Sequence, residues 1–180
     1  MPLVIRPLDS GDRDAVAGII TRAGNFTADE IEVAMELVDE WLANGEDSGY
    51  LTYVLADDSA TRAVHGYVCV GPAPMTEATF DLYWIAVDPT EQGRGYGQRL
   101  LAAAETNVRS RGGRLLLIET ASQAAYAATI RFYERAGYTL ASRIADYYRV
   151  GDDKLVFEKR FSREGSPPTN RALPRGTWRP

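Results

Sequence analysis

Glycines at alternate positions mark the segment of this chain best suited to bind a ligand, Gln92-Gly93-Arg94-Gly95-Tyr96-Gly97. Glycine has no Cβ, so its backbone takes turns closed to other residues and lets a ligand approach the N–H groups. Residues 82–89 before it are β-branched and aromatic and end at a proline, which predicts a strand. Residues 98–111 after it have apolar side chains at helical spacing. Because a helix N-terminus favours an anion, this arrangement predicts a pyrophosphate site.

Two common pyrophosphate loops do not fit this segment. The nicotinamide fingerprint G-x-G-x-x-G fails because the third glycine comes one position early. The ATP loop G-x-x-x-x-G-K-[ST] is absent, and the only lysines of the chain are Lys154 and Lys159. Gln92, Gly95 and Gly97 instead fit the pattern Q/R-x-x-G-x-G/A. The alternative is a tight turn without a ligand, which the flanking strand and helix disfavour.

A second block, 130–138, reads as a helix with a tyrosine that ends at a glycine. Together the two blocks resemble the GNAT superfamily of N-acyltransferases, over residues 3–161. The resemblance implies that the glycine-rich loop holds acetyl-CoA and that a bulge frees strand backbone groups to pair with the extended ligand. Tyr126 and Thr129 stand where many members have asparagine and alanine. The residues so assigned to acetyl-CoA are Ile85, Ala86, Val87, Gln92, Gly93, Arg94, Gly95, Tyr96, Gly97, Gln98, Tyr126 and Thr129.

The same resemblance assigns the general acid to Tyr133, whose phenol would protonate the leaving thiolate. A phenol with a pKa of ~10 protonates a thiolate whose conjugate acid lies near ~8.5 only uphill, so hydrogen bonding contributes as well. The alternative is a core aromatic, because Tyr126, Ile130 and Tyr133 lie at helical spacing.

Two carboxylates are candidates for the base that deprotonates the amine, directly or through water. Asp81 precedes the apolar part of the cofactor strand, where histone-type members carry a glutamate. Glu119 interrupts an apolar strand, where we expect it to be costly to bury unless paired or protonated. An ion pair with an arginine is the alternative for each. We expect structural roles for the single histidine, His65, and for the single cysteine, Cys69, as a buried residue.

These groups require a scaffold that alternates helices and strands. The pattern predicts an α+β fold in three layers, GNAT-like, with a central mixed and mostly antiparallel sheet of about six to seven strands flanked by about four helices. The unit 82–120 is expected to be a right-handed parallel crossover. Predicted strands are 3–6, 50–56, 64–70, 79–87, 114–120, 138–149 and 154–161, and predicted helices are 11–23, 27–43, 98–111 and 126–136.

Size and composition favour one domain over residues 1–161. The net charge of −5 argues against non-specific nucleic-acid binding. An apolar run of membrane-spanning length, a signal peptide and a metal-ligand cluster are not found, so we expect a cytoplasmic protein with neither membrane nor metal. Residues 162–180 contain four prolines and four arginines, which predicts a tail that is flexible or docks on a partner subunit.

The predicted function is an N-acetyltransferase that moves an acetyl group from acetyl-CoA to a primary amine of a small molecule. A protein N-terminal or lysine acetyltransferase is one alternative, and a non-catalytic acyl-CoA-binding module is another. The acidic outer face of the helix 27–43, with Asp81 and Glu119, predicts a negative surface that prefers cationic amines. The tyrosine-rich segment 143–148 suits a peptide-binding hairpin and a homodimer contact equally.

Overall fold

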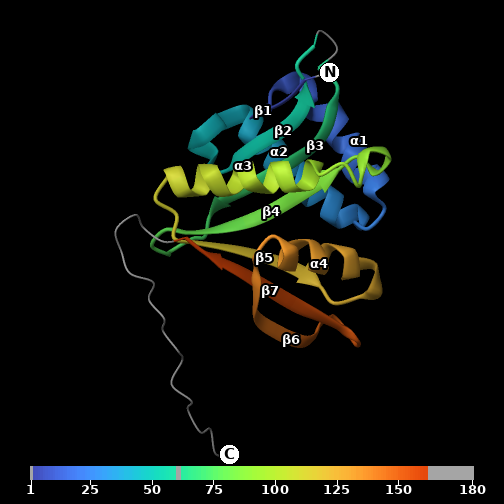
Figure 1. The fold of residues 1–180 in the computed structure, drawn as a ribbon, viewed down its shortest axis with the longest axis vertical. Helices are drawn as coiled ribbons and strands as arrows, with labels where there is room; N and C mark the ends of the chain where they lie inside the picture. The colour runs from blue at the N-terminus through green and yellow to red at the C-terminus, as the bar shows by residue number, and fades with distance from the viewer. Residues whose placement is uncertain (1, 60–61, 162–180) are drawn as a thin grey trace, which may run out of the picture.

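The computed structural model describes residues 2–59 and 62–161, which form a seven-stranded sheet between helices (Figure 1). The strands lie in the order β1-β2-β3-β4-β5-β7-β6, and only β4 and β5 pair in parallel. The predicted fold class is therefore confirmed, and so is the parallel pairing of the two strands in the unit 82–120. The strands are β1 (Leu3–Pro7), β2 (Leu51–Asp57), β3 (Val64–Pro72), β4 (Thr79–Val87), β5 (Leu115–Ala121), β6 (Thr139–Arg149) and β7 (Asp152–Arg160), and the α-helices are α1 (Arg13–Ala23), α2 (Ala28–Asn44), α3 (Tyr96–Ser110) and α4 (Ala127–Arg135).

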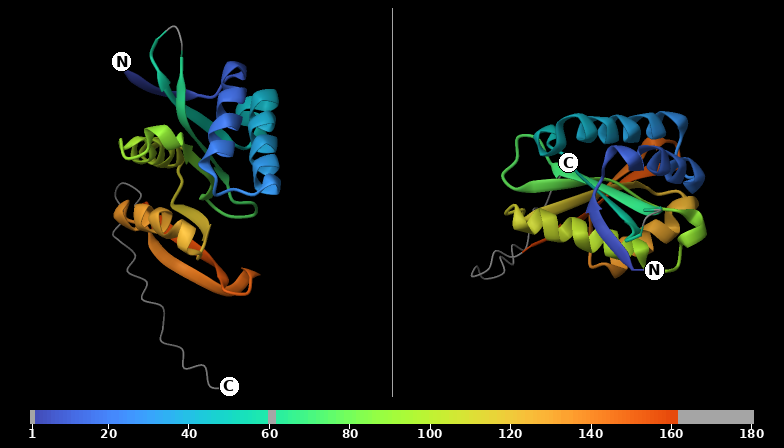
Figure 2. Two further views of the ribbon diagram at one scale, coloured as in Figure 1. Left: turned by 90° about the vertical axis from the view of Figure 1, so that its right-hand side faces the viewer. Right: turned by 90° about the horizontal axis from the view of Figure 1, so that it is seen from above.

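The helices cover the two faces of the sheet in pairs. Helices α1 and α2 lie on one face, and α3 and α4 lie on the other (Figure 2). Each helix turns an apolar stripe to the sheet, as the helical spacing predicts: Val16, Ile19 and Ile20 of α1 and Leu100, Leu101, Ala104 and Val108 of α3 are buried. This burial of apolar surface on both faces is the main source of the free energy of folding.

Local signals set where the helices begin. Thr27 and Glu30 form a capping box: Thr27 Oγ1 accepts from the Glu30 backbone N–H at 3.2 Å, and Glu30 Oε2 accepts from the Thr27 N–H at 2.7 Å. Helix α3 follows Gly95, whose φ of +78° is a left-handed conformation that favours glycine. The start of α3 is thus fixed by the same glycines that the sequence marks as a ligand loop.

Strands β4 and β5 separate halfway along their length. Their parallel pairing runs from Thr79 opposite Leu115 to Leu82 opposite Ile118 and stops there. On its other side, β4 shifts register against β3 so that Tyr83 is an extra residue between Leu82 and Trp84. This β-bulge bends β4 away from β5, which continues along β7 instead. The backbone of residues 83–87 therefore has no strand partner on its β5 side.

The C-terminal hairpin differs from its prediction. The turn is formed by Val150 and Gly151, and β7 begins at Asp152, two residues before the predicted start. Aspartates favour turns, but Asp152 and Asp153 are buried in the strand because other groups bond their carboxylates. The predicted tail, residues 162–180, lies outside the described residues.

Strand β6 forms an open edge of the sheet. All of its residues are exposed, and its neighbour is β7 alone.

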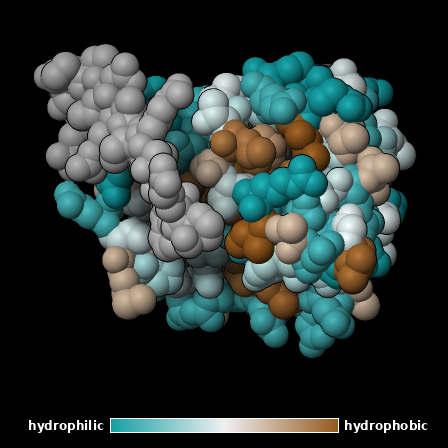
Figure 3. Space-filling model, turned by 90° about the horizontal axis from the view of Figure 1, so that it is seen from below, coloured by the Kyte–Doolittle hydropathy of each residue, from teal (hydrophilic) through white to brown (hydrophobic). Residues whose placement is uncertain are grey.

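Hydrophobic residues appear between hydrophilic ones on the face seen from below in Figure 3. Within the described residues, no helix is long and apolar enough to cross a membrane.

Candidate active site

The glycine-rich loop lies between the end of β4 and the start of α3. Gly93 and Gly95 both have left-handed φ values, +80° and +78°. No atom lies within 4 Å of the place where a Cβ on Gly93 would stand, so the loop borders open space. The loop residues Gln92, Gly93 and Arg94 are exposed. The turned backbone, the open space and the helix N-terminus together fit a phosphate-bearing ligand.

Asp88 fixes the beginning of this loop. Its Oδ1 accepts hydrogen bonds from the Thr90 N–H at 3.0 Å and the Thr90 hydroxyl at 2.7 Å. Its Oδ2 forms an ion pair with Arg22 of α1 at 2.5 Å. The hydrogen bonds from Thr90 and the charge of Arg22 lower the pKa of Asp88 to about 2. Asp88 therefore ties α1 on one face of the sheet to the loop that follows β4.

The residues predicted to pair with an extended ligand lie on the separated part of β4. Ile85, Ala86 and Val87 all follow the bulge at Tyr83, in the part of β4 that pairs with β3 and has no strand partner on its β5 side. Sequence reasoning named these residues and the bulge as family features, and could not place the bulge. The structure shows a feature that suits the predicted pairing, a strand edge with unpaired polar groups.

Tyr133 lies on the α4 side of this gap and is buried. Its ring lies beside those of Phe132, Tyr138 and Phe157, at centroid distances of 5.2, 6.0 and 6.2 Å. Burial raises the pKa of its phenol. Within the described part of the chain, its hydroxyl has no hydrogen-bond partner. Tyr133 is therefore both the core aromatic of the alternative interpretation and a phenol whose hydroxyl is free to bond a ligand.

The two carboxylates lie on the opposite face of the sheet. Ile118 is opposite Phe157 in the strand register, and Phe157 contacts Tyr133 of α4. Because side chains alternate along a strand, Glu119 points away from α4. Asp81 is paired with Leu117 in the register and shares the face of Glu119. Burial and the charge of Glu119 raise the pKa of Asp81.

The two carboxylates nevertheless differ in their surroundings. Glu119 avoids the cost of burial that the sequence suggests: 53% of its side chain is exposed, and it forms an ion pair with Lys154 at 2.6 Å. Strand β5 loses its β4 neighbour just before Glu119, which leaves the side chain open to solvent. Asp81 is half-buried and has no ion pair or hydrogen bond within the described residues. The ion-pair alternative thus holds for Glu119, with a lysine instead of an arginine.

Two pairs of aromatic side chains pack close to these carboxylates. Tyr83, the bulge residue, packs edge-to-face on Tyr50 at 5.5 Å, and burial with the charge of Asp81 raises its pKa to about 12. Trp84 packs on Phe26 of the α1–α2 loop at 5.3 Å. Sequence reasoning missed Tyr83, Trp84 and Lys154 as site residues. The aromatic run 83–84 was visible, but only the bulge brings its side chains to this face.

The α1–α2 loop contacts the residue that directly precedes α4. The Tyr126 hydroxyl, predicted to contact acetyl-CoA, donates a hydrogen bond to the Asn25 carbonyl at 2.8 Å. Burial and the nearby Glu30 raise the pKa of Tyr126. Thr129 is half-buried on the next turn of α4. The contact joins the two helical layers at the open end of the gap.

The single histidine and cysteine lie where a structural role is expected. His65 Nε2 is 3.1 Å from Asp57 Oδ1, and its ring is 5.7 Å from that of Tyr96. Cys69 is buried, which raises the pKa of its thiol to about 11 and keeps the sulfur protonated at neutral pH. No group of three metal-ligating side chains occurs in residues 2–59 and 62–161.

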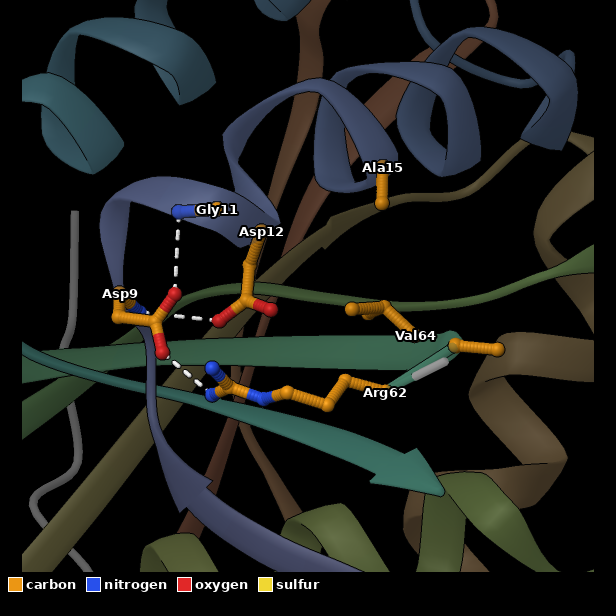
Figure 4. Close-up of a pocket in the computed structure, with 7 residues that line it drawn as sticks. Asp9, Gly11, Asp12, Ala15, Arg62 and Val64 are labelled. Carbon is orange, nitrogen blue, oxygen red and sulfur yellow. Dashed lines mark hydrogen bonds and ion pairs between the residues drawn. The ribbon is translucent and has the colours of Figure 1, made fainter. Parts of the chain in front are cut away.

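A separate cavity of about 290 Å³ lies at the start of α1, beside the hairpin between β2 and β3 (Figure 4). Its acids are already paired: Asp12 accepts two hydrogen bonds from Arg6 at 2.5 and 2.7 Å, and Asp9 pairs with Arg62. The cavity contains none of the predicted site residues, and we assign it no part in the chemistry.

A family model described as an acetyltransferase (GNAT) domain matches residues 48–140. The chain belongs to the GNAT acetyltransferase family. A solved structure of a GNAT-family protein from Desulfovibrio desulfuricans has 42% sequence identity and a TM-score of 0.83, and the match covers 88% of this chain and 99% of that one. This GNAT chain is thus an acetyltransferase, as the two sequence blocks predict.

Solved structures of lower sequence identity share the fold. The ribosomal-protein-S18-alanine N-acetyltransferase from Escherichia coli is 23% identical with a TM-score of 0.71, over 92% of this chain and 99% of that one. A Salmonella typhimurium structure with its cofactor acetyl-CoA is 21% identical with a TM-score of 0.70, over 94% and 99%. No curated protein matches this GNAT chain.

Proposed function

We propose that this acetyltransferase transfers the acetyl group of acetyl-CoA to a primary amine of a small molecule by direct attack. The proposal rests on one observation: the gap between β4 and β5 opens the sheet between Tyr133 on one face and Asp81 on the other. A thioester in this gap can meet the amine from the carboxylate face and release the thiolate toward α4. The Salmonella typhimurium structure, solved with acetyl-CoA, supports the choice of donor.

The reaction needs one bond to form and one to break. The amine nitrogen attacks the thioester carbon, the C–N bond forms, and the C–S bond breaks with its electron pair on sulfur. Asp81 takes the proton that the amine loses, directly or through water, and Tyr133 donates a hydrogen bond or its proton to the thiolate. The unpaired N–H groups of residues 83–87 are the candidates for stabilising the oxyanion. Asp81 is then on the side from which the amine attacks, and Tyr133 is on the side where the thiolate leaves.

Asp81 is the better candidate for the base. Glu119 is held in an ion pair with Lys154, whereas Asp81 is half-buried and unpaired within the described residues. A raised pKa makes the Asp81 carboxylate a stronger base than an ordinary aspartate. Glu119 then acts on the reaction through its charge.

A screen of amines with acetyl-CoA, read as thiol release, tests the proposal. We expect turnover with small amines, and calorimetry should show acetyl-CoA bound far more tightly than NAD or ATP. Gly95→Leu should weaken acetyl-CoA binding, because a side chain at a left-handed position distorts the loop. Stronger NAD binding, or unchanged affinity in Gly95→Leu, would contradict the assigned ligand loop.

A protein acceptor is the second candidate, and the exposed tyrosines of β6 favour it. Tyr147 and Tyr148 pack edge-to-face at 4.9 Å and are about half exposed, as expected for an edge that binds a peptide. Peptides with free α-amines or lysine side chains belong in the same screen. The same edge suits a homodimer, which sedimentation at several concentrations would detect.

A further inference from the structure

The carboxylate face of the site also carries a partly buried positive charge. Lys154 of β7 lies beside Ala121 at the end of β5, and its side chain is 16% exposed. Its Nζ forms an ion pair with Glu119 Oε2 at 2.6 Å and lies 4.9 Å from the centre of the Tyr147 ring. A cation therefore faces the same space as Asp81, so the negative surface that the sequence predicts also contains a positive charge.

The two lysines of the chain differ in how fully they are bonded. Lys159 Nζ bonds both carboxylate oxygens of Glu105 at 2.8 Å and the Ala136 carbonyl at 2.9 Å, which uses all three of its N–H groups. Lys154 has one acceptor, Glu119, among residues 2–59 and 62–161. Two N–H donors of a partly desolvated ammonium therefore remain for a ligand.

Strand β6 is distorted where it passes this lysine. Its register against β7 breaks between Ile144 and Arg149, and Asp146 takes a φ of +54°. The distortion is held in place: the Asp146 N–H donates to Asp153 Oδ1 at 3.0 Å, and Asp146 Oδ1 accepts from the Gly151 N–H at 2.6 Å. Such a backbone costs free energy unless its surroundings stabilise it. In this backbone conformation the ring of Tyr147 lies over the ammonium group of Lys154.

The charges of the face fit an acceptor with two opposite charges. Asp81 and Glu119 are negative, and Lys154 is close enough to lower the pKa of Asp81 by its charge. An amine that approaches Asp81 therefore meets a cation further along the same face. A plain cationic group is repelled by Lys154, whereas a carboxylate finds two free donors there.

We propose that Lys154 binds a carboxylate of the acceptor, so that the preferred substrates are amines that also carry a carboxylate, such as amino acids or short peptides. This specificity rests on the proposed acetyl transfer to amines. Tyr147 shields the lysine from water and strengthens the contact, and Glu119 holds its ammonium toward the gap between β4 and β5.

Matched acceptor pairs test the proposal. Amino acids and dipeptides are assayed beside their own carboxamides, with thiol release from acetyl-CoA as the readout. We expect the wild type to favour the carboxylate member by about tenfold in kcat/KM, the size of one charge-assisted contact. Lys154→Met should bring that ratio to about one, and Lys154→Arg should keep most of it. Arg109→Gln, the same charge change on an exposed residue of α3, should leave the ratio as it is.

The outcomes separate this specificity from the proposed function. If no amine is acetylated, the proposed function fails. If amines are acetylated but carboxylates and carboxamides react equally in the wild type, or Lys154→Met keeps the preference, the role of Lys154 is wrong while the acetyltransferase stands. Glu119→Gln removes the negative charge that competes with the acceptor for Lys154, and it should increase the preference for carboxylates. Acetyl-CoA affinity and the melting temperature of each variant show that the loop and the fold remain intact.

Discussion

Gly97 at the start of α3 lies directly against the ring of Phe132 on α4. A Cβ on Gly97 would stand 3.5 Å from two atoms of that ring and 3.8 Å from Val87 Cγ2. The contact joins the glycine-rich loop, the end of β4 and the helix that carries Tyr133. The two sequence blocks, about 35 residues apart, are thus parts of one packed unit.

This contact predicts opposite effects for two neighbouring glycines. The Gly97→Ala variant should be as stable as the wild type or more stable by about 0.5 kcal/mol, because 3.5 Å is an ordinary contact and alanine favours a helix. The Gly95→Ala variant should lose about 1 kcal/mol, because its φ of +78° disfavours a side chain. Urea unfolding of both variants measures the difference, and equal stabilities would contradict it.

Replacing Tyr133 with phenylalanine should affect turnover and little else. The ring packing survives, and the lost hydroxyl has no hydrogen bond within the described residues, so stability and acetyl-CoA affinity should remain close to wild type. We expect kcat to fall on the order of 100-fold, the usual contribution of a general acid.

Tyr138→Phe is the matched control for that variant. Its hydroxyl donates to Glu105 Oε1 at 3.0 Å, so its loss should cost about 1 kcal/mol of stability. Turnover per folded molecule should change far less than in Tyr133→Phe. If the two variants show the reverse pattern, Tyr133 has a structural role only.

Asp88 predicts a pH-dependent loss of stability. Its pKa is lowered to about 2 in the folded chain, against an ordinary value near 3.9, so its contribution is complete above about pH 4 and is lost as the pH falls toward 2. Asp88→Asn should lower the melting temperature at pH 7 and reduce the acid sensitivity of the fold. A melting temperature that differs from wild type equally at pH 7 and pH 2.5 would contradict the assignment.

The sequence predicts elements well where local signals agree with tertiary packing. The capping box at Thr27 and Glu30 and the limits of β4 are found as predicted, because each depends on residues close in sequence. The bulge at Tyr83 lies where β4 shifts register against β3 and stops pairing with β5. These pairings join segments distant in sequence, so no local pattern predicts the bulge.

The features of the candidate site that the sequence does not predict have the same origin. Glu119 is exposed because β4 leaves β5 at that level, and Lys154 reaches it only because β7, late in the chain, pairs with β5. The run Leu115–Ile118 correctly predicts a buried strand but says nothing of the next residue. Charges that meet across strands distant in sequence therefore require the structure.

The last prediction separates the two carboxylates by their pH profiles. Asp81→Asn should lower kcat/KM on the order of 100-fold, since an amide cannot take the proton of the amine. The same variant should raise the melting temperature at pH 7, because the pKa of Asp81 is raised and its ionised form therefore costs stability above that pKa.

Glu119→Gln should keep substantial activity and shift the acid limb of the pH–rate profile to lower pH, because the charge that raises the pKa of Asp81 is gone while Lys154 remains. Rates of both variants from pH 5 to 9 test the assignment. If Asp81→Asn keeps the wild-type profile and Glu119→Gln loses it, Glu119 is the base; if both keep it, the amine arrives neutral or loses its proton to bulk water.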